Sequence, residues 1–175
     1  MNDEPLLDRD TIDRVFHRLG ERLASRGVVA DLYVFGGAAM AVAYDARRAT
    51  RDIDALFVPH GVVLAEARAV AEEFGLPAWW LNDQASTYVA RDRDLEARTV
   101  FEHRGLRVQA ASPKHLLAMK VLAARRRDAE DIKILVGQLG LASPDEVLTL
   151  CADIFPEEPV PGRARLLLED MFREE

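Results

Sequence analysis

The stretch Tyr33–Phe57 decides the fold: it opens with YVFGG from residue 33 and closes with RRATRDIDALF from residue 47. We expect a hydrophobic strand to end in the glycine pair and a second strand to open with two acids one residue apart. Because side chains alternate faces along a strand, Asp52 and Asp54 should point the same way while Ile53 points into the core. Two carboxylates that face a glycine turn with exposed backbone N–H groups suit a divalent metal ion and a polyphosphate.

Helices and strands alternate around this stretch. The spacing of apolar residues predicts helices over 8–25, 38–44 and 62–74, and strands over 31–35 and 52–58. For the first of these helices, Asp10 or Thr11 is the expected N-cap. The order helix, strand, helix, strand, helix indicates an α/β domain.

The pattern becomes less regular after residue 78. The pair Trp79-Trp80 is expected to cap the core, and Asn82 or Asp83 either begins a helix or reaches into the site. Residues 84–97 are polar and indicate a loop or a short exposed helix. Two short runs around Arg104-Gly105 then predict a hairpin over 99–110.

The remainder of the chain is expected to be helical. Ser112-Pro113 has the residues of a helix start, with serine as the cap and proline at the first helical position. Residues 116–124 are expected to continue this helix, and further helices are expected over 129–139, 144–155 and 163–173. We therefore expect residues 1–111 to form a core with a mixed sheet, and residues 112–175 to form a helical part that packs on it.

Composition limits the classes of function. No apolar run reaches the roughly 18 residues of a membrane span, and the acidic N-terminus lacks the features of a signal peptide, so a cytoplasmic protein is expected. The single cysteine, Cys151, excludes an internal disulfide and a cysteine-based zinc cage. A net charge of −7 argues against a broad basic surface for nucleic acid.

The cations are nevertheless placed unevenly. Arg47, Arg48 and Arg51 flank the acid pair, and Arg125–Arg127 form a run, so a local basic face for phosphates is possible on an acidic protein. The chain has only three lysines, Lys114, Lys120 and Lys133. One of them, Lys120, lies in an apolar helical run, where a lysine is unusual.

The combination of strand, glycine pair, helix, basic connection and Asp-x-Asp strand is more specific than any of its parts. In this combination the sequence resembles the nucleotidyltransferase-fold superfamily, and within it the AbiEii-type toxins of bacterial toxin–antitoxin and phage-defence systems. The residues that carry the resemblance are Gly36-Gly37, Arg48-x-Thr50-x-Asp52-Ile53-Asp54, LLAMK at 116–120 and RDAEDI at 127–132. It extends from about residue 33 to residue 139.

The resemblance implies a nucleotidyltransferase fold of the α/β (α+β) class, with a small mixed sheet flanked by helices. It also implies an enzyme that transfers a nucleoside monophosphate from a nucleoside triphosphate to an acceptor hydroxyl. Asp52 and Asp54 would hold Mg²⁺ or Mn²⁺, and backbone N–H groups of Gly36, Gly37 and Ala38 would bind phosphate.

The resemblance assigns further roles to cationic and acidic side chains. Lys120 would approach the triphosphate. Asp131, or alternatively Asp128, would act as an orienting group or as a base. The phosphate and acceptor contacts would come from the residues beside the acid pair, namely Arg47, Arg48, Thr50 and Arg51.

The sequence departs from the superfamily pattern at two places. Many members have Ser or Thr at or after the second glycine, where this chain has Ala38. Many also have a third acid on the strand beside the Asp-x-Asp strand. We take 106–110 as that strand, and it contains no acid. A full two-metal site is therefore not expected from this strand.

The leading expectation is a magnesium-dependent toxin that adds nucleotides to the tRNA 3′ end, blocks translation and is neutralised by a cognate antitoxin. A second possibility keeps the chemistry but transfers the nucleotide to a protein or a small molecule. A third is a non-catalytic module of the same fold that binds a nucleotide or an antitoxin.

Overall fold

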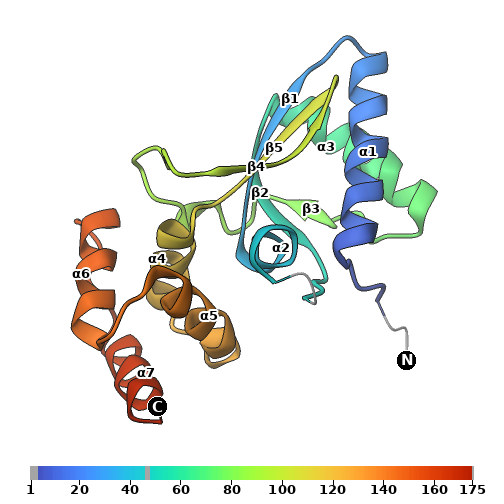
Figure 1. Ribbon diagram of the computed structural model, residues 1–175. Coiled ribbons are helices and arrows are strands. Elements are labelled where there is room, and N and C mark those ends of the chain that lie inside the picture. Colours follow the sequence, from blue (N-terminus) through green and yellow to red (C-terminus); the bar gives the residue numbers. More distant parts are fainter. Residues whose placement is uncertain (1–3, 46–47, 175) are drawn as a thin grey trace. The chain divides into compact units, whose positions relative to one another are not determined.

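The computed structural model describes residues 4–45 and 48–174 (Figure 1). The chain divides into two compact units: unit 1 comprises Met1–Thr87 and Ala97–Ala111, and unit 2 comprises Tyr88–Glu96 and Ser112–Glu175. Each unit is described by itself. The segment 88–96 groups with the helices of unit 2, and the expected packing of residues 112–175 on the core stays a prediction.

Unit 1 contains a five-stranded mixed sheet in the order β3-β2-β1-β5-β4. The strands are β1 (Ala30–Phe35), β2 (Ile53–Val58), β3 (Leu81–Asn82), β4 (Arg98–His103) and β5 (Leu106–Ala110). β1 pairs antiparallel with β2 and parallel with β5, β2 pairs parallel with β3, and β4 and β5 form an antiparallel hairpin. The mixed sheet and the hairpin confirm the α/β expectation.

One expected neighbour was wrong. The strand taken to lie beside the Asp-x-Asp strand, now β5, pairs with β1 instead. The neighbours of β2 are β1 and the two-residue strand β3, which sequence reasoning did not identify. Two residues are too few to show the alternation that indicates a strand.

The register of β1 and β2 places the acid pair at the glycine turn. Phe35, the last residue of β1, lies opposite Asp54. Ile53 is fully buried and Asp54 is partly exposed, as the expected alternation requires. Asp52 immediately precedes β2, so the observed strand begins one residue later than expected.

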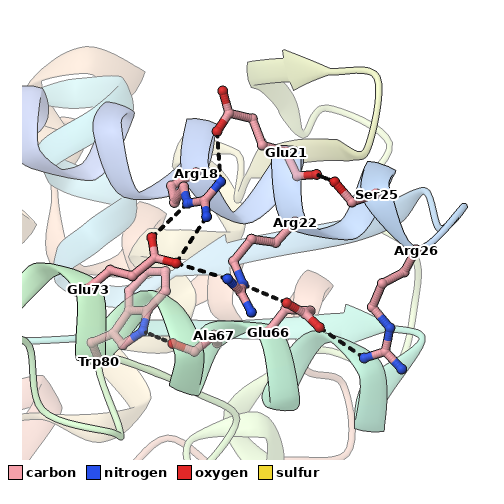
Figure 2. A network of polar contacts seen from close by, with 9 residues as sticks. All are labelled: Arg18, Glu21, Arg22, Ser25, Arg26, Glu66, Ala67, Glu73 and Trp80. Atoms are coloured by element: carbon pink, nitrogen blue, oxygen red, sulfur yellow. Dashed lines mark hydrogen bonds and ion pairs between the residues drawn. The ribbon is translucent and has the colours of Figure 1, made fainter.

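Two helices of unit 1, α1 (Arg9–Ser25) and α3 (His60–Phe74), contact each other and the sheet. Their apolar faces are buried, and their polar faces are joined by the ion pairs that Figure 2 shows. Arg18 contacts Glu73 at 2.6 Å, and Glu66 contacts Arg22 at 2.6 Å and Arg26 at 3.0 Å.

A third helical segment follows the glycine turn. α2 (Gly36–Ala39) continues as one π-helical stretch, η1 (Met40–Tyr44). It begins two residues earlier than expected, at the first glycine of the pair. Its residues Ala38 to Ala41 are buried, so small side chains allow this segment to pack closely.

Unit 2 is helical, with α4 (Pro113–Ala123), α5 (Ala129–Leu139), α6 (Pro144–Ile154) and α7 (Gly162–Arg173). α4 contacts each of the other three, and buries Leu116, Leu117 and Val121. Ser112 caps α4 as expected, because its side chain accepts a hydrogen bond from the N–H of His115. A 3₁₀ turn, Arg126–Asp128, connects α4 to α5.

Within the described part of the chain, no single helix is long and apolar enough to cross a membrane. One pair of segments, Arg126–Leu139 and Pro144–Ile154, meets the length and composition test only when taken together, and it is bent by 90°.

Candidate functional site in unit 1 and a buried ionic cluster in unit 2

The carboxylate of Asp54 lies directly against the glycine turn. Gly36 has φ +65°, a backbone conformation that residues with a Cβ rarely adopt. A Cβ placed on Gly36 would come within 3.2 Å of Oδ2 of Asp54. The backbone angle therefore favours glycine at this position, and any larger residue would press against the carboxylate of Asp54.

The second glycine is approached by the connection that precedes β2. A Cβ on Gly37 would lie 3.1 Å from Oγ1 of Thr50 and 3.9 Å from a guanidinium nitrogen of Arg48. Thr50 is fixed in turn by two backbone hydrogen bonds with the buried Leu7, at 2.7 and 2.9 Å. The N-terminal segment thus holds the hydroxyl of Thr50 against the turn, a contact that links residues far apart in sequence.

Asp52 is held by hydrogen bonds to its backbone carbonyl and to its side-chain carboxylate. Its carbonyl accepts a hydrogen bond of 3.0 Å from Oγ1 of Thr50, and its Oδ2 accepts one of 3.0 Å from the side-chain amide of Asn82. Asn82 lies on β3, in register with Asp54 on β2. Of the two alternatives for Asn82 and Asp83, the structure places Asn82 against the acid pair, whereas Asp83 contacts His60 at 2.8 Å.

The other residues expected around the turn differ in their placement. Ala38 is buried, so its side chain belongs to the core and only its backbone is available to a ligand. Arg51 is exposed. Arg47 lies outside the described residues. Unit 1 therefore brings together Gly36, Gly37, Arg48, Thr50, Asp52 and Asp54.

The site residues expected from the segments 116–120 and 127–132 form a compact cluster inside unit 2. Nζ of Lys120 lies 3.0 Å from Oδ1 of Asp128 and 2.8 Å from Oδ2 of Asp131. All three residues are buried, with 6%, 7% and 1% of their surface exposed. α4 supplies the lysine, the 3₁₀ turn ends in Asp128, and α5 supplies Asp131 in its first turn.

This cluster places one lysine ammonium group against two carboxylates. Removing ionised groups from water costs several kcal/mol for each ion unless they are paired with good geometry. Lys120 contacts both acids, so its positive charge helps to compensate for their burial. The cluster can stabilise unit 2, and this role is compatible with a role in a reaction.

The donor set around the turn fits a hard divalent cation. Among residues 4–45 and 48–174, no group of three or more His, Cys, Asp or Glu side chains could hold a metal ion by itself. Mg²⁺ does not require such a cage, because it keeps several waters and is commonly bound by one or two carboxylates together with substrate phosphates. Asp52 and Asp54 are two carboxylates beside the turn, so the residues present fit such a site.

The structure also gathers a Ser, a His and an Asp that no sequence pattern indicated. Nδ1 of His115 lies 3.2 Å from Oγ of Ser112 and 3.2 Å from Oδ1 of Asp94. Both contacts use the same ring nitrogen, whereas a nucleophile–base–orienter arrangement uses both nitrogens. Ser112 is also fully buried as the cap of α4, and Asp94 accepts its backbone N–H at 2.8 Å. These residues form the start of α4, and their contacts differ from those of a catalytic triad.

A mixed sheet whose glycine turn faces an Asp-x-Asp strand is the arrangement expected of nucleotidyltransferases. The family model described as "Nucleotidyltransferase of unknown function (DUF6036)" matches residues 11–157. The match covers most of the chain, and the chain belongs to this family. The AbiEii-type group stays a prediction.

Two further comparisons add little. No curated protein matches the sequence. One similar solved structure is that of an antigenic nucleotidyltransferase-like protein from Paracoccidioides brasiliensis. It is 18% identical, covers 93% of this chain and 95% of its own, and has a TM-score of 0.46. At this level of likeness, the assignment rests on the family model.

Proposed function

We propose that the chain is a metal-dependent nucleotidyltransferase. A hydroxyl oxygen of the acceptor attacks the α-phosphorus of a nucleoside triphosphate. A new O–P bond forms, the bond to the β-phosphate oxygen breaks, and pyrophosphate leaves. The hydroxyl proton passes to a carboxylate or to water.

The observation that carries the proposal is the approach of Asp54 to Gly36. Because the turn has no Cβ there, the carboxylate and the backbone of the turn can face one ligand together. Asp52 immediately precedes the strand that carries Asp54. A metal–triphosphate complex presents both a cation and an anion, and this pairing of carboxylates with glycine backbone suits such a ligand.

Mg²⁺ or Mn²⁺ held by Asp52 and Asp54 would neutralise phosphate charge and lower the pKa of the acceptor hydroxyl. The chain's own groups would orient the substrate. Backbone N–H groups of Gly36, Gly37 and Ala38 would receive phosphate oxygens, and Arg48 and Arg51 would add positive charge. Thr50 would fix the connection beside Gly37, because its hydroxyl donates to the carbonyl of Asp52.

For unit 2 we propose that Lys120 and the acid pair Asp128 and Asp131 are required for the same reaction. This proposal draws on the resemblance, which assigns Lys120 to the triphosphate and an acid to orientation or proton transfer. Its support in unit 2 is the burial of all three charges, which is costly for groups that serve stability alone.

The acceptor is proposed from the resemblance alone. We propose that the protein is a toxin that modifies the tRNA 3′ end and is neutralised by a cognate antitoxin. The net charge of −7 favours a small footprint on RNA, limited to the arginines around the turn. Transfer to a protein or a small molecule, and binding without catalysis, are the alternatives that the following experiment separates.

The test is transfer of label from an equimolar mixture of α-³²P-labelled nucleoside triphosphates, with Mg²⁺, to total tRNA, to a protein extract and to the small-molecule fraction of a cell extract. We expect label on tRNA with wild type and none with Asp54→Asn. Asp31→Asn is the matched control, because Asp31 is an exposed acid on the neighbouring strand that pairs with Arg107. Label on protein alone would replace the tRNA proposal, and no label on any acceptor would contradict the enzymatic one.

A further inference from the structure

Asn82 makes a set of hydrogen bonds that the packing of β3 alone does not explain. Its amide nitrogen donates to Oδ2 of Asp52 at 3.0 Å and to the carbonyl of Trp79 at 3.1 Å. Its amide oxygen accepts from the N–H of Gln84 at 3.1 Å. Both N–H donors and the carbonyl of this amide are therefore used, and only 6% of the residue is exposed.

The segment that carries Asn82 is itself held firmly. The buried indole of Trp80 donates to the carbonyl of Ala67 on α3 at 2.8 Å, a contact that Figure 2 shows. The carbonyl of Trp80 accepts from the N–H of Ile53 at 2.6 Å, so β3 is attached to β2 at the residue between the two acids. The amide of Asn82 thus reaches Asp52 from a fixed backbone.

We propose that Asn82 is a positioning residue for the metal-binding carboxylate of Asp52, and this rests on the proposed function. The hydrogen bond engages Oδ2 and would leave Oδ1 to bind a metal ion. Asp52 precedes β2 and therefore lacks the pairing with β1 that holds Asp54. Its side chain needs another support. An amide donor supplies that support without adding charge, and such outer contacts to metal ligands commonly contribute 10- to 100-fold to metal affinity.

The first measurement is the binding of Mn²⁺ in the absence of nucleotide and acceptor. Binding is detected by the paramagnetic quenching of tryptophan fluorescence. The two tryptophans of the chain, Trp79 and Trp80, stand just before Asn82 and report on this part of unit 1. We expect Asn82→Ala to raise the dissociation constant for Mn²⁺ roughly 10-fold or more. Asp83→Ala is the matched control, because Asp83 is adjacent but contacts His60 instead, and it should bind Mn²⁺ as wild type does.

The second measurement uses only wild-type protein, so it does not depend on the stability of a variant. In ¹⁵N-labelled protein titrated with Mg²⁺, the side-chain amide signals of Asn82 should shift with the same half-saturation as the backbone signal of Gly36. Shifts at Gly36 without any change at the Asn82 amide would overturn the inference, as would wild-type Mn²⁺ affinity in a folded Asn82→Ala.

These outcomes separate the inference from the function on which it rests. If wild type binds Mn²⁺ and Asp52→Asn loses it, the metal site stands whatever Asn82→Ala does. If wild type and Asp52→Asn respond alike to Mn²⁺, the metal site fails and the role of Asn82 fails with it.

Discussion

Oδ2 of Asp54 lies 3.2 Å from the place that a Cβ on Gly36 would occupy. This contact joins the residue after β1 to the beginning of β2. In the proposed function, Gly36 and Asp54 therefore belong to one ligand-binding surface. Substitutions at the turn should therefore affect ligand binding and stability to different extents.

Gly36→Ala should lose both stability and ligand binding. At φ +65° an alanine costs about 1–2 kcal/mol, and its methyl group also displaces Asp54. Gly75→Ala is the matched control: it has the same φ, and no described atom lies within 4 Å of its added Cβ. Chemical denaturation should show a loss for both variants, at least as large for Gly36→Ala as for Gly75→Ala, whereas Mn²⁺ affinity should fall only in Gly36→Ala. Equal Mn²⁺ affinity in the two variants would contradict the proposed surface.

Lys120→Met should destabilise unit 2 strongly. Removing one partner from a buried ionic group typically costs about 3–5 kcal/mol, because the remaining charges are left without compensation. Unfolding is best followed by circular dichroism, since both tryptophans lie in unit 1. Lys133→Met is the control, because Lys133 is partly exposed and its contact with Glu130 is 3.7 Å long, and it should cost less than about 1 kcal/mol.

A further variant tests whether charge is the cause. Replacing the acids as well, in Lys120→Met/Asp128→Asn/Asp131→Asn, should recover part of the lost stability, because no uncompensated charge stays buried. A triple variant that is less stable than Lys120→Met would show that packing and hydrogen bonding in the cluster outweigh its charge balance.

Acid should weaken the contact between α1 and α3. The hydrogen bond from Arg18 lowers the pKa of Glu73 below its ordinary 4.5. A carboxyl with a lowered pKa in the folded state stabilises the fold above its ordinary pKa, and this contribution is lost as the pH falls through the lowered value. Glu73→Gln should therefore show a smaller drop in melting temperature below pH 4.5 than wild type. The same change at its exposed neighbour Glu72 should keep the wild-type acid response.

Cys151 should be unreactive in the folded protein. Burial raises the pKa of its thiol to about 12, so almost no thiolate is present at neutral pH. Labelling with a thiol reagent at pH 7.5 should be slow in the native protein and become fast in denaturant. Fast stoichiometric labelling under native conditions would show that α6 opens readily.

The sequence was most informative where the structure is local. The turn Gly36-Gly37 and the start of β2 are encoded within a short stretch, so their alternation and glycine pattern could be interpreted directly. The cap at Ser112 is equally local. At the first helix the cap was placed too late: Asp8, rather than Asp10 or Thr11, accepts the N–H of Thr11. Several polar residues in a row make such boundaries ambiguous.

The contacts that sequence reasoning missed depend on strands and segments distant in sequence. Asn82 reaches Asp52 because β3 pairs with β2, and Thr50 is fixed because Leu7 crosses to it. Asp94 supports the start of α4 from a segment expected to be a loop or a short exposed helix. Each contact depends on how distant segments of the chain come together, which no local pattern of residues specifies.

The central claim is tested most directly by asking which phosphorus atom is transferred. Wild type incubated with Mg²⁺, tRNA and either α-³²P- or γ-³²P-labelled nucleoside triphosphates should attach the α-label to tRNA and release the γ-label as pyrophosphate. Asp54→Asn should do neither, and Asp31→Asn should behave as wild type. Attachment of the γ-label, or equal transfer by wild type and Asp54→Asn, would contradict nucleotidyl transfer at the glycine turn.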